Sequence, residues 1–159
     1  MPVVWTIGHS NMEIDDFLGL LHTHGIRCVV DVRSAPYSRH VPHFNRTEIK
    51  RALESAGIRY LFMGDALGGR IKDEDGARPR TYAQAIADPS FHSGIDTLLN
   101  EAGEAHTAVM CAEKDPNRCH RRHIIAAVLD ERDVTVRHIL SDGKTVTERE
   151  LMGLFGKKT

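Results

Sequence analysis

The sequence predicts an α/β fold, a three-layer, doubly wound sandwich around a mostly parallel sheet of five strands. Short apolar runs of strand length alternate along the chain with stretches whose apolar residues recur at helical spacing. A helical stretch separates each strand from the next, which favours parallel pairing because parallel neighbours need a crossover connection. The 159 residues are enough for one core, so we expect a single domain over residues 1–159.

The first half of the chain is expected to form three strands and two helices. A Ser-x-x-Glu capping box at residues 10–13 predicts the start of the first helix, which ends at Gly25. Asn45 with Glu48 predicts the start of the second helix, which ends at Gly57. The strands are expected at residues 3–7, 28–32 and 58–62.

The second half is expected to add two strands and the remaining helices. Residues 64–79 are rich in glycine and charge and show no clear period, which is typical of a surface loop or a mobile lid. Thr147 with Glu150 predicts the cap of a short last helix. One or two helices are expected between residues 82 and 102, another at about 118–131, and strands at 107–111 and 134–140.

The apparent burial of each strand suggests the strand order. The first, second and fourth strands are nearly continuous apolar runs, whereas the third contains Arg59 and the fifth alternates apolar with polar residues. We therefore expect the third and fifth strands at the edges, which gives the Rossmann-like order 3-2-1-4-5. The flavodoxin-like order 2-1-3-4-5 would place the apolar second strand at an edge. In the favoured order the loops after the first and fourth strands face each other across the crevice where such sheets bind ligands.

Charge and composition restrict the function classes. The net charge of −1 gives no overall basicity to indicate nucleic-acid binding, although a local basic patch remains compatible with it. No apolar stretch approaches the roughly 18 residues that span a bilayer, and residues 1–7 lack the features of a secretory signal. Three cysteines in a chain of this size predict reduced thiols. We therefore expect a cytoplasmic protein without membrane association.

Residues 111–123 hold the densest group of reactive side chains, between the fourth strand and a helix. Cys119 is expected in the first turn of that helix, where the helix dipole, free amides and nearby Arg121 favour its thiolate. The alternative is that Cys111 and Cys119 are packing residues. We predict that Cys119 or Cys111 is a nucleophile, that His9 or His120 is the acid–base group, and that Glu113 orients a histidine or acts as a base.

The spacing of these residues does not match other known cysteine or metal loops. A tyrosine-phosphatase loop needs arginine where Asn117 stands, and neither cysteine begins the tight cradle of a rhodanese-type loop. We predict no metal ligand and no cofactor. A zinc or iron site is an alternative, although its ligands match no short zinc pattern and would need His9 to complete a tetrahedron. Those ligands are Cys111, Cys119, His120 and His123.

Polar residues from other loops are expected at the same crevice. Asp31 and Arg33 lie two apart on one sheet face, where the carboxylate would hold the guanidinium in place. The glycines after the third strand permit a close backbone approach to a ligand. Ser10 has the alternative role of helix cap. The predicted substrate-binding residues are Ser10, Asp31, Arg33, Ser38, Arg39, Gly68, Gly69 and Arg121.

An ordered set of short motifs resembles one protein family. These motifs are Thr6-Ile7-Gly8-His9-Ser10, Asp31-Val32-Arg33-Ser34 with Pro36 and Ser38-Arg39, Gly57-Ile58 with Tyr60, Leu67-Gly68-Gly69, Cys111-Ala112-Glu113, Cys119-His120-Arg121 and His138-Ile139. In this respect the chain, from residue 6 to about residue 140, is similar to the domain-of-unknown-function family number 488. The resemblance implies a small cytosolic bacterial or archaeal α/β protein and no established activity.

The leading hypothesis from the sequence is an enzyme that acts on a small anionic substrate, such as a phosphorylated metabolite or a nucleotide. Arg33, Arg39 and Arg121 would hold the anion. A rival hypothesis is a non-catalytic module that binds a nucleotide or a nucleic-acid end through the same arginines. A third is a metal-binding protein that uses the cysteines and histidines.

Overall fold

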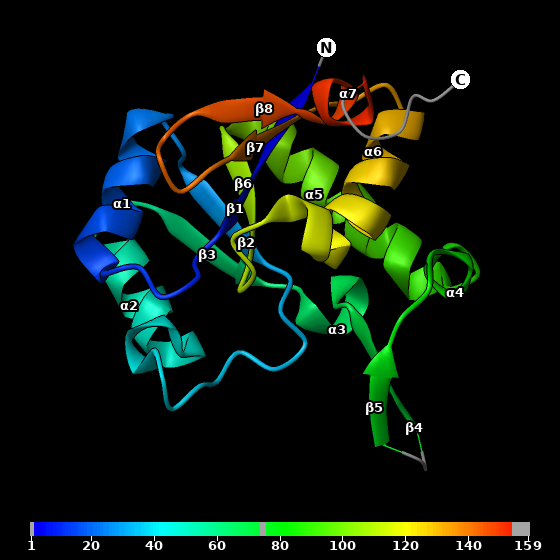
Figure 1. Cartoon of the computed structure of the whole chain (residues 1–159), viewed down its shortest axis with the longest axis horizontal. Coiled ribbons are helices and arrows are strands. Elements are labelled where there is room, and N and C mark those ends of the chain that lie inside the picture. Colours follow the sequence, from blue (N-terminus) through cyan, green and yellow to red (C-terminus); the bar gives the residue numbers. More distant parts are fainter. Residues whose placement is uncertain (1, 74–75, 154–159) are drawn as a thin grey trace.

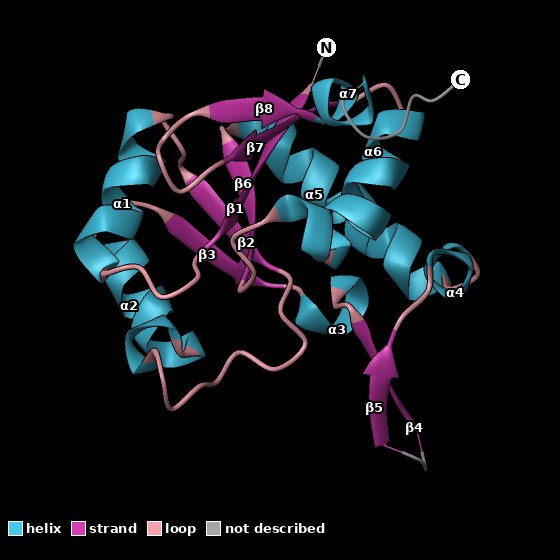
Figure 2. Cartoon of the chain, viewed as in Figure 1, coloured by secondary structure: helices cyan, strands magenta, loops and turns pink. Residues whose placement is uncertain are grey.

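The computed structural model describes residues 2–73 and 76–153, so residues 74–75 of the predicted loop and the extreme ends of the predicted domain lie outside the description. The described residues form an α/β fold around a mostly parallel sheet with helices on both faces (Figures 1 and 2). Within them the main sheet has the order β3-β2-β6-β1-β7-β8, and β8 alone is antiparallel to its neighbour. Its strands are β1 (Val3–Gly8), β2 (Cys28–Asp31), β3 (Arg59–Phe62), β6 (Thr107–Cys111), β7 (Thr135–Ile139) and β8 (Thr145–Thr147).

The predicted order 3-2-1-4-5 is wrong, because the fourth predicted strand, β6, lies between β2 and β1. All five residues of β6 are buried, which suits a central strand flanked on both sides. The predicted edge strand β7 is covered by β8, a three-residue strand too short to predict from its sequence. β3 is an edge strand as expected. The first and fourth predicted strands are neighbours, with Gly8 opposite Cys111.

Two helical layers cover the sheet (Figure 1). α1 (Ile14–Thr23) and α2 (Arg46–Ser55) bury Phe17, Leu21 and Leu53 against one face. On the other face, α5 (Pro89–Glu104), the π-helical turn η3 (Arg121–Ala126) and α6 (Ala127–Glu131) bury residues such as Phe91 and Leu129. Each such side chain contributes roughly 1.5–3 kcal/mol on burial. The chain leaves β1 toward the first layer and leaves β6 toward the second, so their outgoing loops diverge from one point of the sheet edge.

The predicted cap of the first helix is wrong. α1 begins after Glu13, and Ser10 has a φ of 49° with its hydroxyl directed to Asn11. The reason is that the backbone amides of His9 and Ser10 donate to the carbonyls of Cys111 and Ala112, at the end of β6 and directly after it, which delays the helix. Asn45 does precede α2, but its side chain accepts from the amide of Ser38 and ties down the preceding loop instead of capping the helix.

The remaining elements lie around the periphery of the sheet (Figure 1). The described part of residues 64–79 contains α3 (Gly64–Leu67) and a hairpin of β4 (Arg70–Asp73) and β5 (Gly76–Pro79), which extends away from the main sheet (Figure 1). The predicted capping box of Thr147 and Glu150 is confirmed at α7 (Glu148–Leu151). In the described ranges, no helix has the length and apolarity needed to cross a membrane. Further short elements are η1 (Pro42–Phe44), α4 (Tyr82–Ile86) and η2 (Pro116–Arg118).

Candidate functional site

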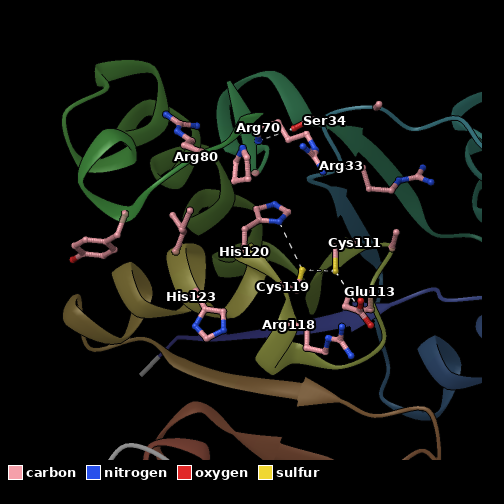
Figure 3. Close-up of a pocket in the computed structure, with 16 residues that line it drawn as sticks. Arg33, Ser34, Arg70, Arg80, Cys111, Glu113, Arg118, Cys119, His120 and His123 are labelled. Atoms are coloured by element: carbon pink, nitrogen blue, oxygen red, sulfur yellow. Dashed lines mark hydrogen bonds between the residues drawn. The ribbon is translucent and has the colours of Figure 1, made fainter. Parts of the chain in front are cut away.

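A cavity of about 590 Å³ lies at the carboxyl ends of β2 and β6, the edge where the sequence predicted a site (Figure 3). Its lining combines residues that follow β2, the start and end of the β4–β5 hairpin, and the segment from β6 to η3. Two thiols and an imidazole lie at one side, and arginines surround them. The charged and reactive lining residues are Arg33, Arg70, Arg80, Cys111, Glu113, Arg118, Cys119, His120 and His123.

The two cysteines of this cavity are in direct contact. Cys111 is the last residue of β6, and Cys119 lies between η2 and η3. Their Sγ atoms are 2.9 Å apart, and both residues are buried although they line the cavity. Both are free cysteines. At this distance one thiol donates its proton to the other sulfur, so the pair shares a proton.

Arg121 supplies the positive charge beside this pair. The side chain is fully buried, and its Nη1 donates to Cys111 Sγ at 3.2 Å and to the carbonyl of Glu113 at 2.9 Å. Nη2 donates to the carbonyl of Lys114 at 3.0 Å. Among the described residues, Nε has no hydrogen-bond partner and no carboxylate forms an ion pair with this guanidinium. Because an uncompensated buried charge is costly, the arrangement favours a thiolate at Cys111.

The electrostatics place the negative charge on Cys111 and the proton on Cys119. Burial alone raises the pKa of Cys111, but the hydrogen bond from Cys119 and the charge of Arg121 outweigh it and lower that pKa to about 7. The hydrogen bond to Cys111, burial and the negative charge of Cys111 raise the pKa of Cys119 well above its ordinary value. The backbone amide of Arg121 does donate to Cys119 Sγ, at 3.4 Å, but this helix-start effect is the weaker one.

This charge distribution reverses a sequence-based expectation. The position of Cys119 at a helix start predicted that its own thiolate would be favoured. The nearer influence is instead Cys111, whose sulfur holds the Cys119 proton. Cys111 is therefore the more nucleophilic of the two sulfurs.

His120 lies against Cys119 on the cavity side. Its Nε2 is 3.2 Å from the carbonyl of Val32, and its Nδ1 is 3.7 Å from Cys119 Sγ (Figure 3). A carbonyl only accepts, so Nε2 carries the proton and Nδ1 is an acceptor that faces the Cys119 thiol. Burial lowers the pKa of His120 to about 4, so the imidazole is neutral at pH 7. A Cβ on Gly69 would come within 2.7 Å of the imidazole, and the glycine therefore permits this packing.

Gly8 lets the loop after β1 pack against the loop that joins Cys111 to Cys119, called here the cysteine loop. A Cβ at this position would overlap the carbonyl oxygen of Glu113 and the guanidinium of Arg121. Directly after it, the amide of His9 donates to the carbonyl of Cys111 at 2.9 Å. The two loops were predicted to face each other across a crevice, but they are in direct contact, and no residue of the loop after β1 lines the cavity. Their direct contact requires a residue without a side chain at position 8.

Arg33 is held by the carboxylate of Asp31. Nε donates to Oδ1 at 2.8 Å and Nη2 to Oδ2 at 2.7 Å, while Tyr60 donates its hydroxyl to the same carboxylate at 2.6 Å. This is the pairing expected from their spacing, and it leaves Arg33 at the cavity wall with Asp31 behind it. His9 stacks on Phe44 with ring centroids 4.4 Å apart, and its Nε2 is 3.3 Å from Arg33 Nη1.

The predicted site residues divide into three groups. His9, although near Arg33, does not line the cavity, and burial lowers its pKa to about 4. The side chain of Glu113 accepts from the amide of Asp115, and no contact with a histidine is present among the described residues. Cavity-lining residues are Cys111, Cys119, His120, Glu113, Arg33 and Gly69; Arg121 and Asp31 lie behind the lining; His9, Ser10, Ser38, Arg39 and Gly68 are not part of it.

Several lining residues were missed as binding residues. Arg70 is the first residue of β4 and Arg80 directly follows β5, so the pairing of these strands brings both to one wall of the cavity. Arg80 is buried and donates to Asp88 at 2.7 Å, whereas Arg70 and Arg118 are exposed and form no ion pair with any described residue. Gly68 and Gly69 were the sequence signal for this wall of the cavity, because paired glycines allow the backbone to approach another group closely. Other lining residues that were not proposed for binding are Ser34, Tyr82, Arg118 and His123.

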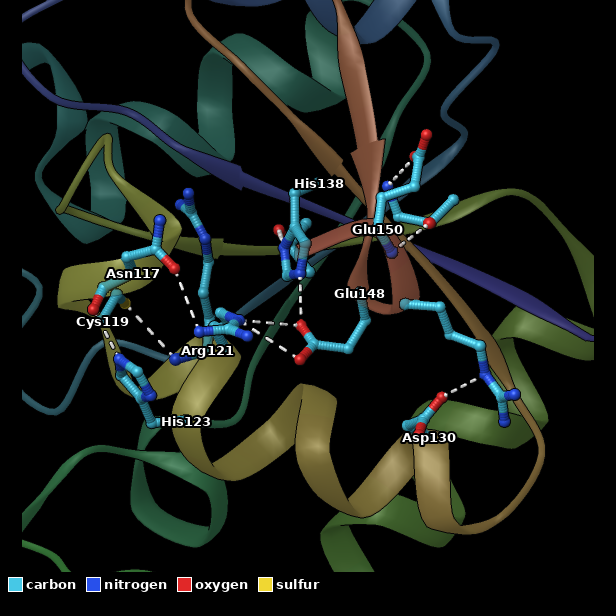
Figure 4. A network of polar contacts seen from close by, with 12 residues as sticks. Asn117, Cys119, Arg121, His123, Asp130, His138, Glu148 and Glu150 are labelled. Carbon is cyan, nitrogen blue, oxygen red and sulfur yellow. Dashed lines mark hydrogen bonds and ion pairs between the residues drawn. The ribbon is translucent and has the colours of Figure 1, made fainter. Parts of the chain in front are cut away.

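A second polar network connects residues 117–122, on both sides of Cys119, to β7 and α7 (Figure 4). Buried His138 contacts Thr6 Oγ1 at 2.7 Å and Glu148 at 2.9 Å. Glu148 in turn accepts from Nε of Arg122 at 3.2 Å, and Nη1 of Arg122 donates to Asn117 at 3.0 Å. The residues on both sides of Cys119 are therefore fixed from β7 and α7.

The cysteines and histidines of the site do not form a metal-ligand cluster. His123 Nε2 contacts the carbonyl of Asn117, and His120 Nε2 contacts that of Val32. Across residues 2–73 and 76–153, no three histidine, cysteine, aspartate or glutamate side chains are arranged to hold a metal ion. The zinc or iron alternative therefore lacks its ligand set within that part of the chain.

Comparison with known proteins gives one result. The family model described as domain of unknown function DUF488 matches residues 13–128, which confirms the resemblance inferred from the motifs. No curated protein and no solved structure matches the chain. The matched region contains both cysteines, His120 and Arg121, and it ends before β7.

Proposed function

The chain belongs to the DUF488 family, and we propose that it is an enzyme that acts on a small anionic substrate through the thiolate of Cys111. The observation that carries this proposal is the buried guanidinium of Arg121, which donates to Cys111 Sγ and is in an ion pair with no described carboxylate. The thiolate is the nucleophilic form of cysteine, and a fixed positive charge is the usual means of stabilising it at neutral pH.

The shape and charge of the cavity support an anionic ligand. A volume of about 590 Å³ suits a small molecule. Arg33 and Arg80 are fixed by Asp31 and Asp88, whereas Arg70 and Arg118 stay available for a ligand. Guanidinium groups bind phosphate and carboxylate oxygens in a planar, two-pronged way. A phosphorylated or nucleotide-like substrate would place its anionic group among these arginines and its reactive atom toward Cys111.

His120 is the better of the two predicted acid–base residues. It lines the cavity and contacts Cys119, whereas His9 is buried behind Arg33. The neutral imidazole presents Nδ1 as a hydrogen-bond acceptor toward the thiol of Cys119, which orients that thiol.

The pH dependence of alkylation tests the nucleophile directly. Reduced protein is treated with iodoacetamide from pH 5 to 10, and the modified cysteine is identified by peptide mass spectrometry. We expect Cys111 to react with an apparent pKa near 7, and we expect Cys111→Ser to abolish that phase. An apparent pKa of Cys111 near the ordinary value of about 8.5 would contradict the proposal.

A non-catalytic binding module is the second candidate, since the exposed guanidiniums of Arg70 and Arg118 suit binding without chemistry. Thermal shift with phosphate, sulfate, nucleotides, short single-stranded oligonucleotides and zinc identifies the class of ligand that binds, because a ligand stabilises the fold by mass action. The Arg70→Ala and Arg118→Ala variants should lose the anion-dependent shift. Arg51→Ala, an exposed arginine on α2, is the matched control. A binding module would keep its ligand but show no chemistry that depends on Cys111.

A further inference from the structure

In the mechanism proposed above, the thiol of Cys119 only donates a hydrogen bond to the Cys111 thiolate, although it is the group closest to the nucleophile. Its Sγ is 2.9 Å from Cys111 Sγ, and it also faces Nδ1 of His120 at 3.7 Å. Beyond that hydrogen bond, a simple hydrolase or transferase gains nothing from a second thiol at this place, because that thiol would attack a covalent intermediate on Cys111. Such an attack is the useful step if the reaction is a redox reaction.

We propose that Cys111 and Cys119 are a redox-active dithiol that reduces a small anionic disulfide and is itself converted to the Cys111–Cys119 disulfide. The proposal rests on the proposed function, in that it uses the same nucleophile and the same arginine-lined cavity. It adds the substrate class and gives Cys119 the role of the resolving thiol.

The geometry needs little adjustment for this bond to form. A disulfide requires an S–S distance of about 2.05 Å, so the sulfurs must approach by less than about 1 Å from their present 2.9 Å. Cys119 lies in extended backbone between two helical turns, and its two flanks are held by Arg122 and Asn117. The dithiol and the disulfide can therefore share nearly the same backbone.

The first step is attack by the Cys111 thiolate on one sulfur of the substrate R–S–S–R. A bond forms between Cys111 and one RS unit, the substrate S–S bond breaks, and RS⁻ leaves. The thiolate has then lost its charge, so Cys119 no longer has an anion to hold its proton. Arg121 remains beside it, with its backbone amide 3.4 Å from Cys119 Sγ.

The second step is attack by Cys119 on Cys111 Sγ. The Cys119 proton passes to a departing RS⁻, which is a stronger base than the His120 imidazole that faces the thiol at 3.7 Å. The Cys111–Cys119 bond forms and the second RS⁻ leaves. In sum, two electrons pass from the dithiol to the substrate, which becomes RS⁻ and RSH. Two equivalents of a small thiol return the protein to the dithiol state.

The charge of the cavity selects the kind of disulfide. Arg70 and Arg118 at the mouth form no ion pair with any described residue, and Arg33 and Arg80 add fixed positive charge to the wall. Substrates with carboxylate groups are therefore attracted, whereas cationic disulfides are repelled.

The test compares an anionic with a cationic disulfide on the full chain. Reduced protein is mixed with glutathione disulfide or with cystamine at pH 7.5 and followed by intact-protein mass spectrometry. We expect wild-type protein to lose the mass of two hydrogens without a lasting adduct. Glutathione disulfide should react about tenfold faster than cystamine, and dithiothreitol should restore the dithiol.

Variants separate the two steps. Cys119→Ser should retain one glutathione unit on Cys111, and Cys111→Ser should gain none. The third cysteine is an internal control, because Cys28 is buried at the opposite end of β2 and burial raises its pKa to about 11. Circular dichroism checks each fold, and Cys119→Ala replaces Cys119→Ser if the latter is unfolded.

The outcomes distinguish this inference from the proposed function. If wild-type protein keeps the glutathione adduct while Cys111 still alkylates with a pKa near 7, the dithiol proposal is overturned and the nucleophile stands. A faster reaction with cystamine would overturn the substrate class. If Cys111 reacts with neither disulfide nor iodoacetamide at pH 7.5, both proposals are wrong.

Discussion

Two buried arginines, Arg33 and Arg121, lie at the same edge of the sheet but differ in their partners, since only Arg33 is paired with a carboxylate in the described part of the chain. Arg33 forms a two-pronged ion pair with Asp31 and also donates to the carbonyl of Phe44 at 2.7 Å. Arg121 is more deeply buried, yet it donates to two carbonyls and to Cys111 Sγ, and no described carboxylate pairs with it. A guanidinium whose charge is neutralised by a carboxylate, such as Arg33, mainly stabilises the fold. An unpaired one keeps its charge for a neighbouring group, which here is the sulfur of Cys111.

The largest expected effect is on the stability of the paired site. Arg33→Met leaves the Asp31 carboxylate buried without its cation, and breaking a buried pair in this way costs about 3–5 kcal/mol. We therefore expect the free energy of unfolding, measured with urea, to fall by that amount. A loss below about 1 kcal/mol would mean that Asp31 is not the charge partner that the geometry indicates.

The histidine beside each arginine gives a second, smaller effect at acid pH. Burial lowers the pKa of both His9 and His120 to about 4, against about 6.5 in the unfolded chain. The unfolded state binds the proton first, so stability is complete above pH 6.5 and is lost as the pH falls toward 4. We expect each histidine to account for about 2 kcal/mol of that loss.

Urea unfolding at pH 7 and pH 4.5 measures this loss. His9→Asn and His120→Asn should each show a shallower decline than wild-type protein between those two pH values. The exposed His22 on α1 serves as the control site, and His22→Asn should follow the wild-type curve. Equal declines in all four proteins would mean that His9 and His120 have the same pKa in the folded and unfolded states, so burial does not lower it.

The smallest free-energy effect, but the most informative one, concerns the unpaired arginine. Arg121→Met removes a buried cation without leaving a carboxylate behind, so we expect less change in the free energy of unfolding than for Arg33→Met. The pKa of Cys111 should rise by at least about one unit, which slows its alkylation at pH 7 about tenfold. Iodoacetamide rates on both variants measure the contrast. Equal rates for Arg121→Met and wild-type protein would show that Arg121 does not stabilise the thiolate.

Much of the fold follows from local sequence patterns, but the neighbours within the sheet do not. Both β1 and β6 are apolar enough to be central, and apolar content does not decide which of them lies next to β2. That choice depends on how each connection packs over the sheet. Similarly, Ser10 and Glu13 match the pattern of a capping box but do not cap the helix, because hydrogen bonds to Cys111 and Ala112 fix the backbone of His9 and Ser10.

The edge of the sheet that carries the cavity could be predicted from the sequence, because Cys111 ends one parallel strand and Arg33 follows another, and such strands end at the same edge. Arg70 and Arg80 could not be assigned to it, because a hairpin without a recognisable strand pattern brings them together. The charge state of the two cysteines could not be predicted from the sequence either. It depends on the 2.9 Å contact between two sulfurs and on the direction of the Arg121 side chain, and neither is encoded in residue spacing.

The most direct test of the account is the titration of the Cys111 thiolate by its ultraviolet absorbance, as the difference between wild-type protein and Cys111→Ser. We expect one thiolate that forms with a midpoint near pH 7. A difference spectrum with no thiolate until pH 8.5 or above would contradict it.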